Sequence, residues 1–377
     1  MEGREKLLDW AKREGASLHG VYPTETPYRG AGMAAGRHLK EGEDILYVPT
    51  GLVRSLHTVP EHVSRKLPSD TSIHALLAAD LTVNGMTELA LWRDCLPTLA
   101  DFSTGMPFMW HKKLQELLPK PARELLENQL GNFHRDWARV TKAFPDLQQE
   151  DYLHNWLAVS TRSFYYWTPQ MELYPPADRL ALVPIADLFN HADTGCGASF
   201  TPDGFVVSTD RKYHVGQEIY ISYGTHTNDL LLAEYGFVPM ANRWDKTCLD
   251  DVILPRLSPD QKKLLRDNKL LGPFLLDTAT LGCRKTQAAI RLLCPCSRPQ
   301  WEDFLDEEGC GEHCREAMNA LLRSLLTEYM ATARKTVREV AELEVGQSAQ
   351  RELLGQRWRQ IEVTVSQAIK RLQGRDR

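Results

Sequence analysis

Residues 216–224 read Gly216-Gln217-Glu218-Ile219-Tyr220-Ile221-Ser222-Tyr223-Gly224. A glycine turn opens this stretch and apolar residues follow at every second position, so we predict a β-strand over residues 218–221. Strand alternation places Ile219, Ile221 and Tyr223 on one face. Tyr223 then lies at the strand end, where its hydroxyl is free to point into a cleft, although most tyrosines at such places only pack.

The segment Asp187-Leu188-Phe189-Asn190-His191 closes an apolar run that begins with Leu180-Ala181-Leu182-Val183-Pro184-Ile185, itself predicted to be a strand. Burying an amide and an imidazole together is costly unless both are hydrogen bonded. Asn190 and His191 are therefore either a satisfied polar pair at a strand end or part of a binding site.

Two other segments combine glycine with unusual neighbours. Arg29-Gly30-Ala31-Gly32-Met33 is predicted to be a glycine turn, and its glycines would let the backbone approach a flat cofactor closely. The turn lacks the third glycine and the following helix of a dinucleotide site, so a plain tight turn is equally consistent. Tyr235-Gly236-Phe237 follows a short helix-like stretch, and its two aromatic rings either line a narrow channel or fill a core.

Composition excludes several classes of protein. The 377 residues carry 45 Lys and Arg against 50 Asp and Glu, a net charge of −5, so nucleic acid is not expected as the primary partner. No secretory signal follows Met1, and no stretch approaches the roughly 18 apolar residues of a membrane helix. The eight cysteines then indicate reduced thiols, and we predict a soluble intracellular protein, cytoplasmic and/or nuclear.

Hydrophobic periodicity divides the chain into blocks. An amphipathic helix over 1–15 precedes Gly-punctuated short strands, among them Ile45-Leu46-Tyr47-Val48. Helical spacing then dominates from about 60 to 166, and strands return at 180–221. After about residue 254 the chain is helical, and a seam of apolar residues spaced by four and three indicates a helix hairpin or coiled coil. This seam consists of Leu354, Trp358, Ile361, Val365, Ala368 and Leu372.

Four cysteines near the C-terminal helices raise the question of a metal site. They are Cys294, Cys296, Cys310 and Cys314. Their CxC and CxxxC spacings fit structural zinc patterns poorly, so we predict free thiols and no metal. No Ser-His-Asp or Cys-His order stands out for nucleophilic catalysis.

In their order along the chain, these segments resemble the SET-domain protein-lysine methyltransferases, in the branch of the Rubisco large-subunit methyltransferase. The motifs are Gly30-Ala31-Gly32-Met33, Ser160-Thr161-Arg162-Ser163-Phe164, Asp187 to His191, Gly216 to Gly224, and Asn228 to Phe237. The resemblance implies an α+β fold: a SET β-fold with a pseudoknot over 16–240, a helical insert at about 60–160, and an all-α substrate-binding domain over 245–377.

The resemblance implies an S-adenosylmethionine-dependent lysine methyltransferase that acts on a non-histone intracellular protein and releases S-adenosylhomocysteine. Cys196 lies five residues after His191 and no CxCxxxxC cluster follows, which is unlike the histone-specific branch. Tyr235 favours lysine, since a histidine-methylating relative lacks this tyrosine. A histidine or small-molecule acceptor is the alternative, and a non-catalytic scaffold is a third reading.

The resemblance also implies roles for single residues. Tyr223 and Tyr235 would be catalytic, and the pseudoknot would bring Asn190 and His191 beside Tyr223. The cofactor would contact Arg29, Gly30, Ala31, Gly32, Arg162, Asn190, His191, Tyr223 and Phe237. The substrate would contact Arg162, Asp187, Tyr223, Tyr235 and Phe237. Arg29 stands where relatives often carry an acidic or polar residue. The partner implied is a protein with an exposed lysine, docked by the insert and the C-terminal helices, with no membrane involved.

Overall fold

The computed structural model describes residues 2–26, 30–85, 90–276, 281–294 and 312–375. The chain divides into two compact units. The first unit comprises Met1–Ser103 and Glu127–Thr225, and the second comprises Thr104–Leu126 and His226–Arg377. Each unit is therefore built from two separate stretches of sequence. We call them the sheet unit and the helical unit.

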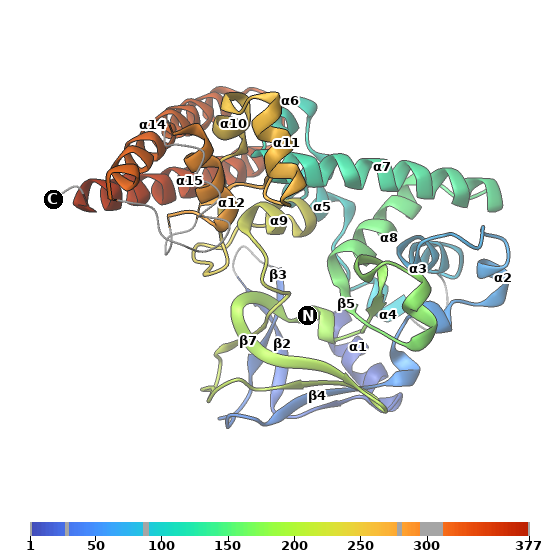
Figure 1. Ribbon diagram of the computed structural model, residues 1–377. Coiled ribbons are helices and arrows are strands. Elements are labelled where there is room, and N and C mark those ends of the chain that lie inside the picture. Colours follow the sequence, from blue (N-terminus) through green and yellow to red (C-terminus); the bar gives the residue numbers. More distant parts are fainter. Residues whose placement is uncertain (1, 27–29, 86–89, 277–280, 295–311, 376–377) are drawn as a thin grey trace. The chain divides into compact units, whose positions relative to one another are not determined.

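A seven-stranded sheet forms the centre of the sheet unit, with strand order β1-β4-β8-β7-β9-β3-β2. Its strands are β1 (Ser17–Leu18), β2 (Val21–Thr26), β3 (Gly30–Ala35), β4 (Asp44–Pro49), β7 (Asn190–Thr201), β8 (Gly204–Ser208) and β9 (Glu218–Ile221). Neighbours are antiparallel except β7 and β9, which are parallel. The three late strands β8, β7 and β9 thus lie side by side in the middle of the sheet, with two early strands on each side of them (Figure 1).

Two predictions of local structure are wrong. Residues 30–33 of the predicted glycine turn instead form the start of strand β3, which pairs with both β2 and β9; within residues 30–33 only Gly30 has a positive φ, of +73°. The strand predicted over 180–185 is shorter. It forms β6 (Leu180–Leu182), which pairs with β5 (Ser163–Tyr165), and it ends before the left-handed backbone of Ile185.

In the sequence, the predicted helical block lies between strands β4 and β5. Its helices are α2 (Glu61–Ser64), α3 (Ile73–Val83), α4 (Ala90–Arg93), α5 (Leu99–Gly105), α7 (Lys120–Ala143) and α8 (Gln149–Arg162), and the N-terminal helix is α1 (Glu2–Arg13). Helices α3 and α8 pack against each other, and the apolar side chains of α3 are buried, among them Ile73, Leu76, Leu77 and Leu81. The Ser72 hydroxyl caps α3 by accepting from the Ala75 N–H, while the Asp178 carboxylate accepts from the Ile73 and His74 N–H groups.

The helical unit is dominated by two long helices, α14 (Glu312–Glu342) and α15 (Ser348–Arg375), which form a hairpin (Figure 1). Every residue of the predicted seam from Leu354 to Leu372 is buried, so the seam is an intramolecular helix contact. The shorter α-helices and the strands of this unit are α6 (Lys112–Glu116), α9 (Asn228–Leu230), α10 (Asp250–Ile253), α11 (Pro259–Asp267), α12 (Arg284–Leu293), β10 (Thr247–Cys248) and β11 (Leu275–Leu276).

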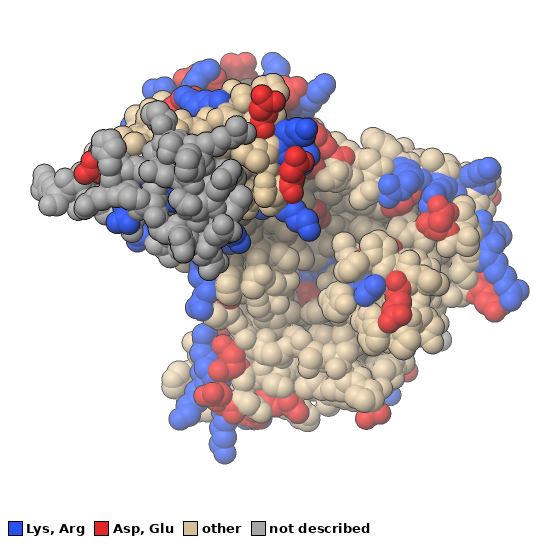
Figure 2. All heavy atoms as spheres, viewed as in Figure 1, with Lys and Arg blue, Asp and Glu red and all other residues tan. Residues whose placement is uncertain are grey.

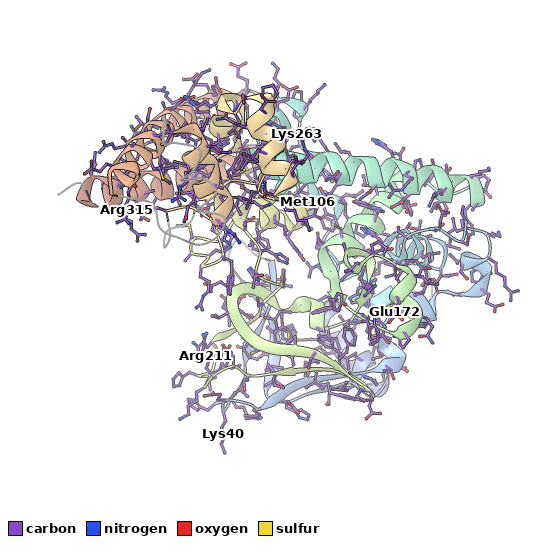
Figure 3. The ribbon with its side chains drawn as sticks, in the orientation of Figure 1. Lys40, Met106, Glu172, Arg211, Lys263 and Arg315 are labelled. Atoms are coloured by element: carbon purple, nitrogen blue, oxygen red, sulfur yellow. The ribbon has the colours of Figure 1, made fainter. Side chains whose placement is uncertain are left out.

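Charged side chains of both signs occur on the surface. Figure 2 shows basic and acidic residues interspersed on the face that is drawn. At one end of the sheet, Lys40 and Arg211 extend from neighbouring turns (Figure 3). The Thr209 hydroxyl links the two turns by donating to the carbonyls of Lys40 and Glu43. Across the ranges that the structure describes, no helix combines the length and apolar content needed to cross a bilayer.

Candidate active site

The point where β7 and β9 meet brings together the polar residues that the sequence singles out. In the parallel ladder, Asn190 lies opposite Tyr220 and His191 opposite Ile221. Just beyond β9, the backbone N–H of Tyr223 donates to Nδ1 of His191 over 3.0 Å, and the centroids of the two rings lie 5.0 Å apart. The expected juxtaposition of Asn190 and His191 with Tyr223 is therefore confirmed. Asn190 and His191 begin a strand, however, rather than ending one.

Both amide hydrogens of Asn190 are engaged. Its Nδ2 donates to the Ala31 carbonyl over 3.0 Å and to Oε1 of Glu218 over 2.9 Å. The same carboxylate accepts from the Tyr220 hydroxyl over 2.6 Å. The amide orientation is thus set by β3 and β9 together, which leaves Oδ1 of Asn190 as its acceptor for an incoming donor.

The Gly30-Ala31-Gly32 segment lies beside this amide, because β3 is the neighbour of β9 in the sheet. A Cβ added to Gly30 would meet nothing within 4 Å, so there is open space at the start of the strand. Backbone groups beside open space suit a cofactor that binds through main-chain contacts. The Arg29 predicted for the same contact lies outside the described residues.

Arg162 and Asp187 are joined through the backbone. The Arg162 guanidinium, at the end of α8, donates to the Asp187 carbonyl over 2.5 Å. Oδ2 of the buried Asp187 carboxyl accepts from the Trp92 indole over 3.1 Å, while Oδ1 has no partner among the described residues. Burial raises the pKa of Asp187 above its usual range, against the opposing charge of Arg162.

Strained backbone lies directly before this carboxyl. Ile185 is fully buried and has φ +75°, a conformation that a β-branched residue rarely adopts. It precedes the single 3-10 turn Ala186–Leu188, which turns the chain from β6 toward β7. Strain of this kind persists only where the surrounding structure enforces it, and it is typical of functional sites.

The sequence suggested a free hydroxyl on Tyr223. In the structure this hydroxyl instead donates to the Phe189 carbonyl over 2.9 Å. This bond aims the phenol at the segment between Asp187 and Asn190. Burial raises the pKa of Tyr223 above its ordinary value of 10.0, although the charge of Arg162 opposes the shift. The residue therefore stays a neutral phenol at pH 7, and its oxygen still has lone pairs that accept hydrogen bonds.

Tyr235 and Phe237 belong to the helical unit. Tyr235 ends a π-helix over Leu231–Tyr235, and Gly236 follows in the left-handed conformation with φ +77°. The two rings meet edge to face with centroids 6.3 Å apart, and the centroid of the His226 ring lies 6.2 Å from that of Tyr235. The paired rings form an aromatic wall, which is suited to an ammonium or methylated ammonium group.

Sequence reasoning missed Glu218 and Trp92. Glu218 lies within the quoted strand, but its contact with Asn190 spans 28 positions and depends on the parallel pairing of β7 with β9. Trp92 reaches Asp187 across 95 positions. The one available signal was strand alternation, which places Glu218 on the face opposite the buried Ile219 and Ile221.

The prediction that the chain binds no metal stays a prediction. Cys294 is buried, whereas Cys296, Cys310 and the side chain of Cys314 lie outside what the structure describes. No group of three potential metal ligands occurs among the described side chains.

Residues 30–224, just over half of the chain, match the family model described as SET domain. The ribosomal lysine N-methyltransferase set11 of Schizosaccharomyces pombe is 28% identical over 236 residues, which cover 62% of this chain and 60% of that protein. SET domain-containing protein 4 of Homo sapiens is 25% identical over 286 residues, which cover 70% of this chain and 64% of that protein. The chain thus spans less than two thirds of each of these relatives.

The fold has also been seen in solved structures. The SET domain of LSMT bound to lysine and AdoHcy superposes with a TM-score of 0.68 at 15% identity, and the match covers 100% of this chain and 92% of that chain. The mixed sheet with its interrupting helices and its helical C-terminal part is therefore the expected architecture.

Proposed function

Because this chain belongs to the SET-domain family, we propose that it is an S-adenosylmethionine-dependent protein-lysine N-methyltransferase that acts on a non-histone protein. The observation that carries this proposal is the hydrogen bond from the Tyr223 N–H to His191, with Asn190 beside it. It joins two motifs that lie 32 positions apart within the family match.

The cofactor side of the site is built from the sheet unit. The backbone of Gly30, Ala31 and Gly32, with Asn190 and His191, would hold S-adenosylmethionine, and Arg162 would face its carboxylate. When bound, the cofactor supplies an electrophilic methyl group on a positively charged sulfur. The Asn190 carbonyl oxygen is suited to accept from its amino group, because the amide hydrogens are already engaged.

The chemical task of the protein is to present a neutral amine in line with that methyl group. A lysine amine is protonated at pH 7, and burial beside another cation lowers its pKa. Tyr235 and Phe237 would wall the channel that excludes water from the amine. Tyr223 would orient the reactants through its hydroxyl oxygen, and the carbonyls near Arg162 and Asp187 would accept from the amine. Alignment of this kind supplies much of a rate enhancement.

The substrate class is a protein with an exposed lysine. Relatives that carry lysine methyltransferase names, among them one from yeast described as ribosomal, support this class. We propose that the helical insert and the C-terminal helices dock the substrate, and that the enzyme works in the cytoplasm or nucleus.

The test is incubation of the purified protein with methyl-labelled S-adenosylmethionine and an extract of source cells that lack the gene. Labelled methyl-lysine in a discrete protein band is the expected result, and a Tyr223→Phe control is expected to remove it. Labelled methyl-histidine would show that the acceptor is histidine rather than lysine. Release of S-adenosylhomocysteine without labelled protein would show a small-molecule acceptor. Failure to bind S-adenosylhomocysteine in calorimetry would favour a non-catalytic scaffold.

A further inference from the structure

The segment that carries Tyr235 and Phe237 has little regular structure of its own. A π-helix is rare and usually found as a single turn, as it is here over Leu231–Tyr235. Residues 236–246 contain no helix or strand. A Cβ added to Gly105 would lie 2.6 Å from the Gly236 carbonyl oxygen, so the two backbones approach closely and leave no space for a side chain at this turn. Side-chain contacts from elsewhere in the helical unit therefore help to hold this segment in place.

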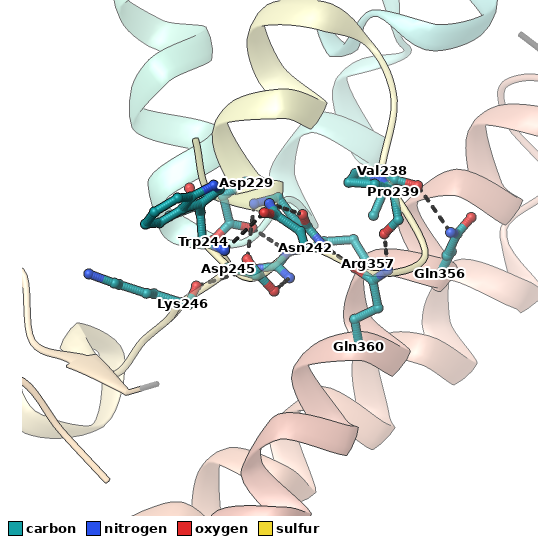
Figure 4. A network of polar contacts seen from close by, with 12 residues as sticks. Asp229, Val238, Pro239, Asn242, Trp244, Asp245, Lys246, Gln356, Arg357 and Gln360 are labelled. Atoms are coloured by element: carbon teal, nitrogen blue, oxygen red, sulfur yellow. Dashed lines mark hydrogen bonds and ion pairs between the residues drawn. The ribbon is translucent and has the colours of Figure 1, made fainter. Parts of the chain in front are cut away.

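One fully buried guanidinium contacts both ends of this segment (Figure 4). Nε of Arg357, in α15, donates to Oδ1 of Asp229 over 2.6 Å, and Nη1 donates to Oδ2 of Asp245 over 2.7 Å. Asp229 lies just before the π-helix, and Asp245 lies eight residues after Phe237. Arg357 thus fastens the entry and the exit of the segment with one planar group.

Two glutamines of α15 add contacts to Val238 and Pro239, which follow the aromatic pair in the sequence (Figure 4). Gln360 donates to the Pro239 carbonyl over 2.7 Å and accepts from the Asn228 amide over 2.8 Å. Gln356 donates to the Val238 carbonyl over 3.2 Å. These contacts reach to the residue that follows Phe237.

The two ion pairs, with Asp229 and Asp245, require an arginine at position 357. Burial pulls the pKa of Arg357 down, but the carboxylates of Asp229 and Asp245 outweigh it and hold that pKa above its ordinary value. Arg357 is therefore always charged. A lysine would supply the charge as a single point and could not reach two carboxylates with a planar fork.

We propose that Arg357 is a positioning residue for the aromatic wall: through Asp229 and Asp245 it sets where Tyr235 and Phe237 stand, and hence how well the acceptor amine is aligned and how many methyl groups fit. The inference rests on the proposed function. It gives α15 a role in catalytic geometry that is separate from docking the substrate.

The test compares Arg357→Lys and the milder Gln360→Ala with Glu362→Gln. The control removes an ion pair from the same helix, because the described partner of the Glu362 carboxylate is Arg334 on α14, which donates to it over 2.6 Å. Steady-state kinetics give kcat and KM for the protein substrate, and mass spectrometry gives the number of methyl groups added. Thermal unfolding gives the folded fraction of each variant.

We expect kcat to fall about 10- to 100-fold in Arg357→Lys, the scale expected for a misplacement of about 1 Å, with a smaller fall in Gln360→Ala. The distribution of mono-, di- and trimethylated product should change in both variants and stay unchanged in Glu362→Gln. Loss of activity only in proportion to the unfolded fraction, with an unchanged product distribution, would overturn the inference. So would wild-type kinetics in both variants. An inactive wild-type protein would instead refute the proposed function.

Discussion

At the scale of single residues, Tyr223 combines two contacts that separate its structural from its chemical role. Its backbone N–H is bonded to His191 and its hydroxyl to the Phe189 carbonyl. Only the second contact depends on the side-chain oxygen. A phenylalanine at this position therefore keeps the join between β7 and β9.

We predict that Tyr223→Phe lowers turnover by about 10²- to 10⁴-fold, the range for a positioned group that acts in the transition state. Stability should fall by only about 1 kcal/mol, since one hydrogen bond is lost. Methyl transfer from labelled S-adenosylmethionine measures the first effect and urea unfolding the second. Phe164→Tyr in β5 serves as a control that changes an aromatic side chain outside the proposed site; turnover of Tyr223→Phe equal to that of this control would contradict the assigned role.

Proximity between residues was predictable where the order of motifs along the chain was enough, whereas the roles of those residues stay predictions. The pairing of His191 with Tyr223 follows from the family resemblance and is confirmed. The contacts of Glu218 with Asn190, and of Trp92 with Asp187, were not predictable, because they depend on which strand faces and helices meet in three dimensions. The hydroxyl partner of Tyr223 was missed for the same reason.

At the scale of elements, the site depends on how closely β7 crosses β9. His191 and Cys196 both pair with Ile221, so the strand makes an irregular excursion between them. Gly195 lies in this excursion. A Cβ added there would lie 2.5 Å from the Tyr220 carbonyl oxygen and 2.9 Å from Cα of Ile221.

We predict that Gly195→Ala separates the two strands and weakens binding of S-adenosylhomocysteine by at least about tenfold, the scale of a loss of about 1.4 kcal/mol. Calorimetry measures the affinity. Gly197→Ala is the matched control in the same strand, because its Cβ would meet only the Ser208 carbonyl oxygen at 3.8 Å, an ordinary contact. Equal affinity in the two variants would show that the close crossing does not support the cofactor site.

The contact between α3 and α8 predicts a dependence of stability on pH. The His74 ring stacks on Trp156 with centroids 4.4 Å apart, and its Nε2 lies 2.9 Å from the Trp156 carbonyl. Burial lowers the pKa of His74 from 6.5 to about 4, so the folded protein binds fewer protons than the unfolded chain between these values. The neutral, buried His74 therefore contributes to the free energy of unfolding. This contribution is complete above pH 6.5 and is lost as the pH falls toward 4.

The free energy of unfolding should therefore drop by about 1–3 kcal/mol through this histidine between about pH 7 and pH 4. Urea unfolding at a series of pH values measures the drop. His74→Gln should flatten the curve, whereas His134→Gln, which alters an exposed histidine of α7, should leave it unchanged. A curve for His74→Gln that is parallel to wild type would contradict the prediction.

Elements with a strong period were predicted well. Strands β4 and β9 lie where alternation and the glycine turn place them, and the seam of α15 is buried as its spacing indicates. The prediction of a turn after Arg29 was wrong because it relied on the frequency of glycine in turns. In the structure these glycines belong to β3, which lies between two partner strands. Pairing partners, rather than local preference, decided that conformation.

At the scale of the whole molecule, the two units interleave along the sequence. The helical unit includes Thr104–Leu126, although most of it follows His226. The Leu117 carbonyl accepts from the Trp358 indole over 2.8 Å, and Leu114 and Leu118 of the same stretch are buried. The early stretch therefore completes its fold with the late helices.

We predict that a chain cut after Thr225 exposes the apolar side chains of this stretch, binds a hydrophobic dye and aggregates. Fluorescence and light scattering measure both effects. Replacing Leu114 and Leu118 by glutamine in the shortened chain should reduce both signals. A shortened chain that stays monomeric and dye-free would show that the early stretch does not need the late helices.

The hydrogen bond from Trp358 to Leu117 can form only after both residues have been synthesised. The two residues are 241 positions apart. At roughly 5–20 residues per second, a ribosome adds the later one about 12–48 s after the earlier one. The nascent chain must keep its Leu114-to-Leu118 stretch from aggregating for that interval, so we expect chaperones to bind this protein while it is being synthesised.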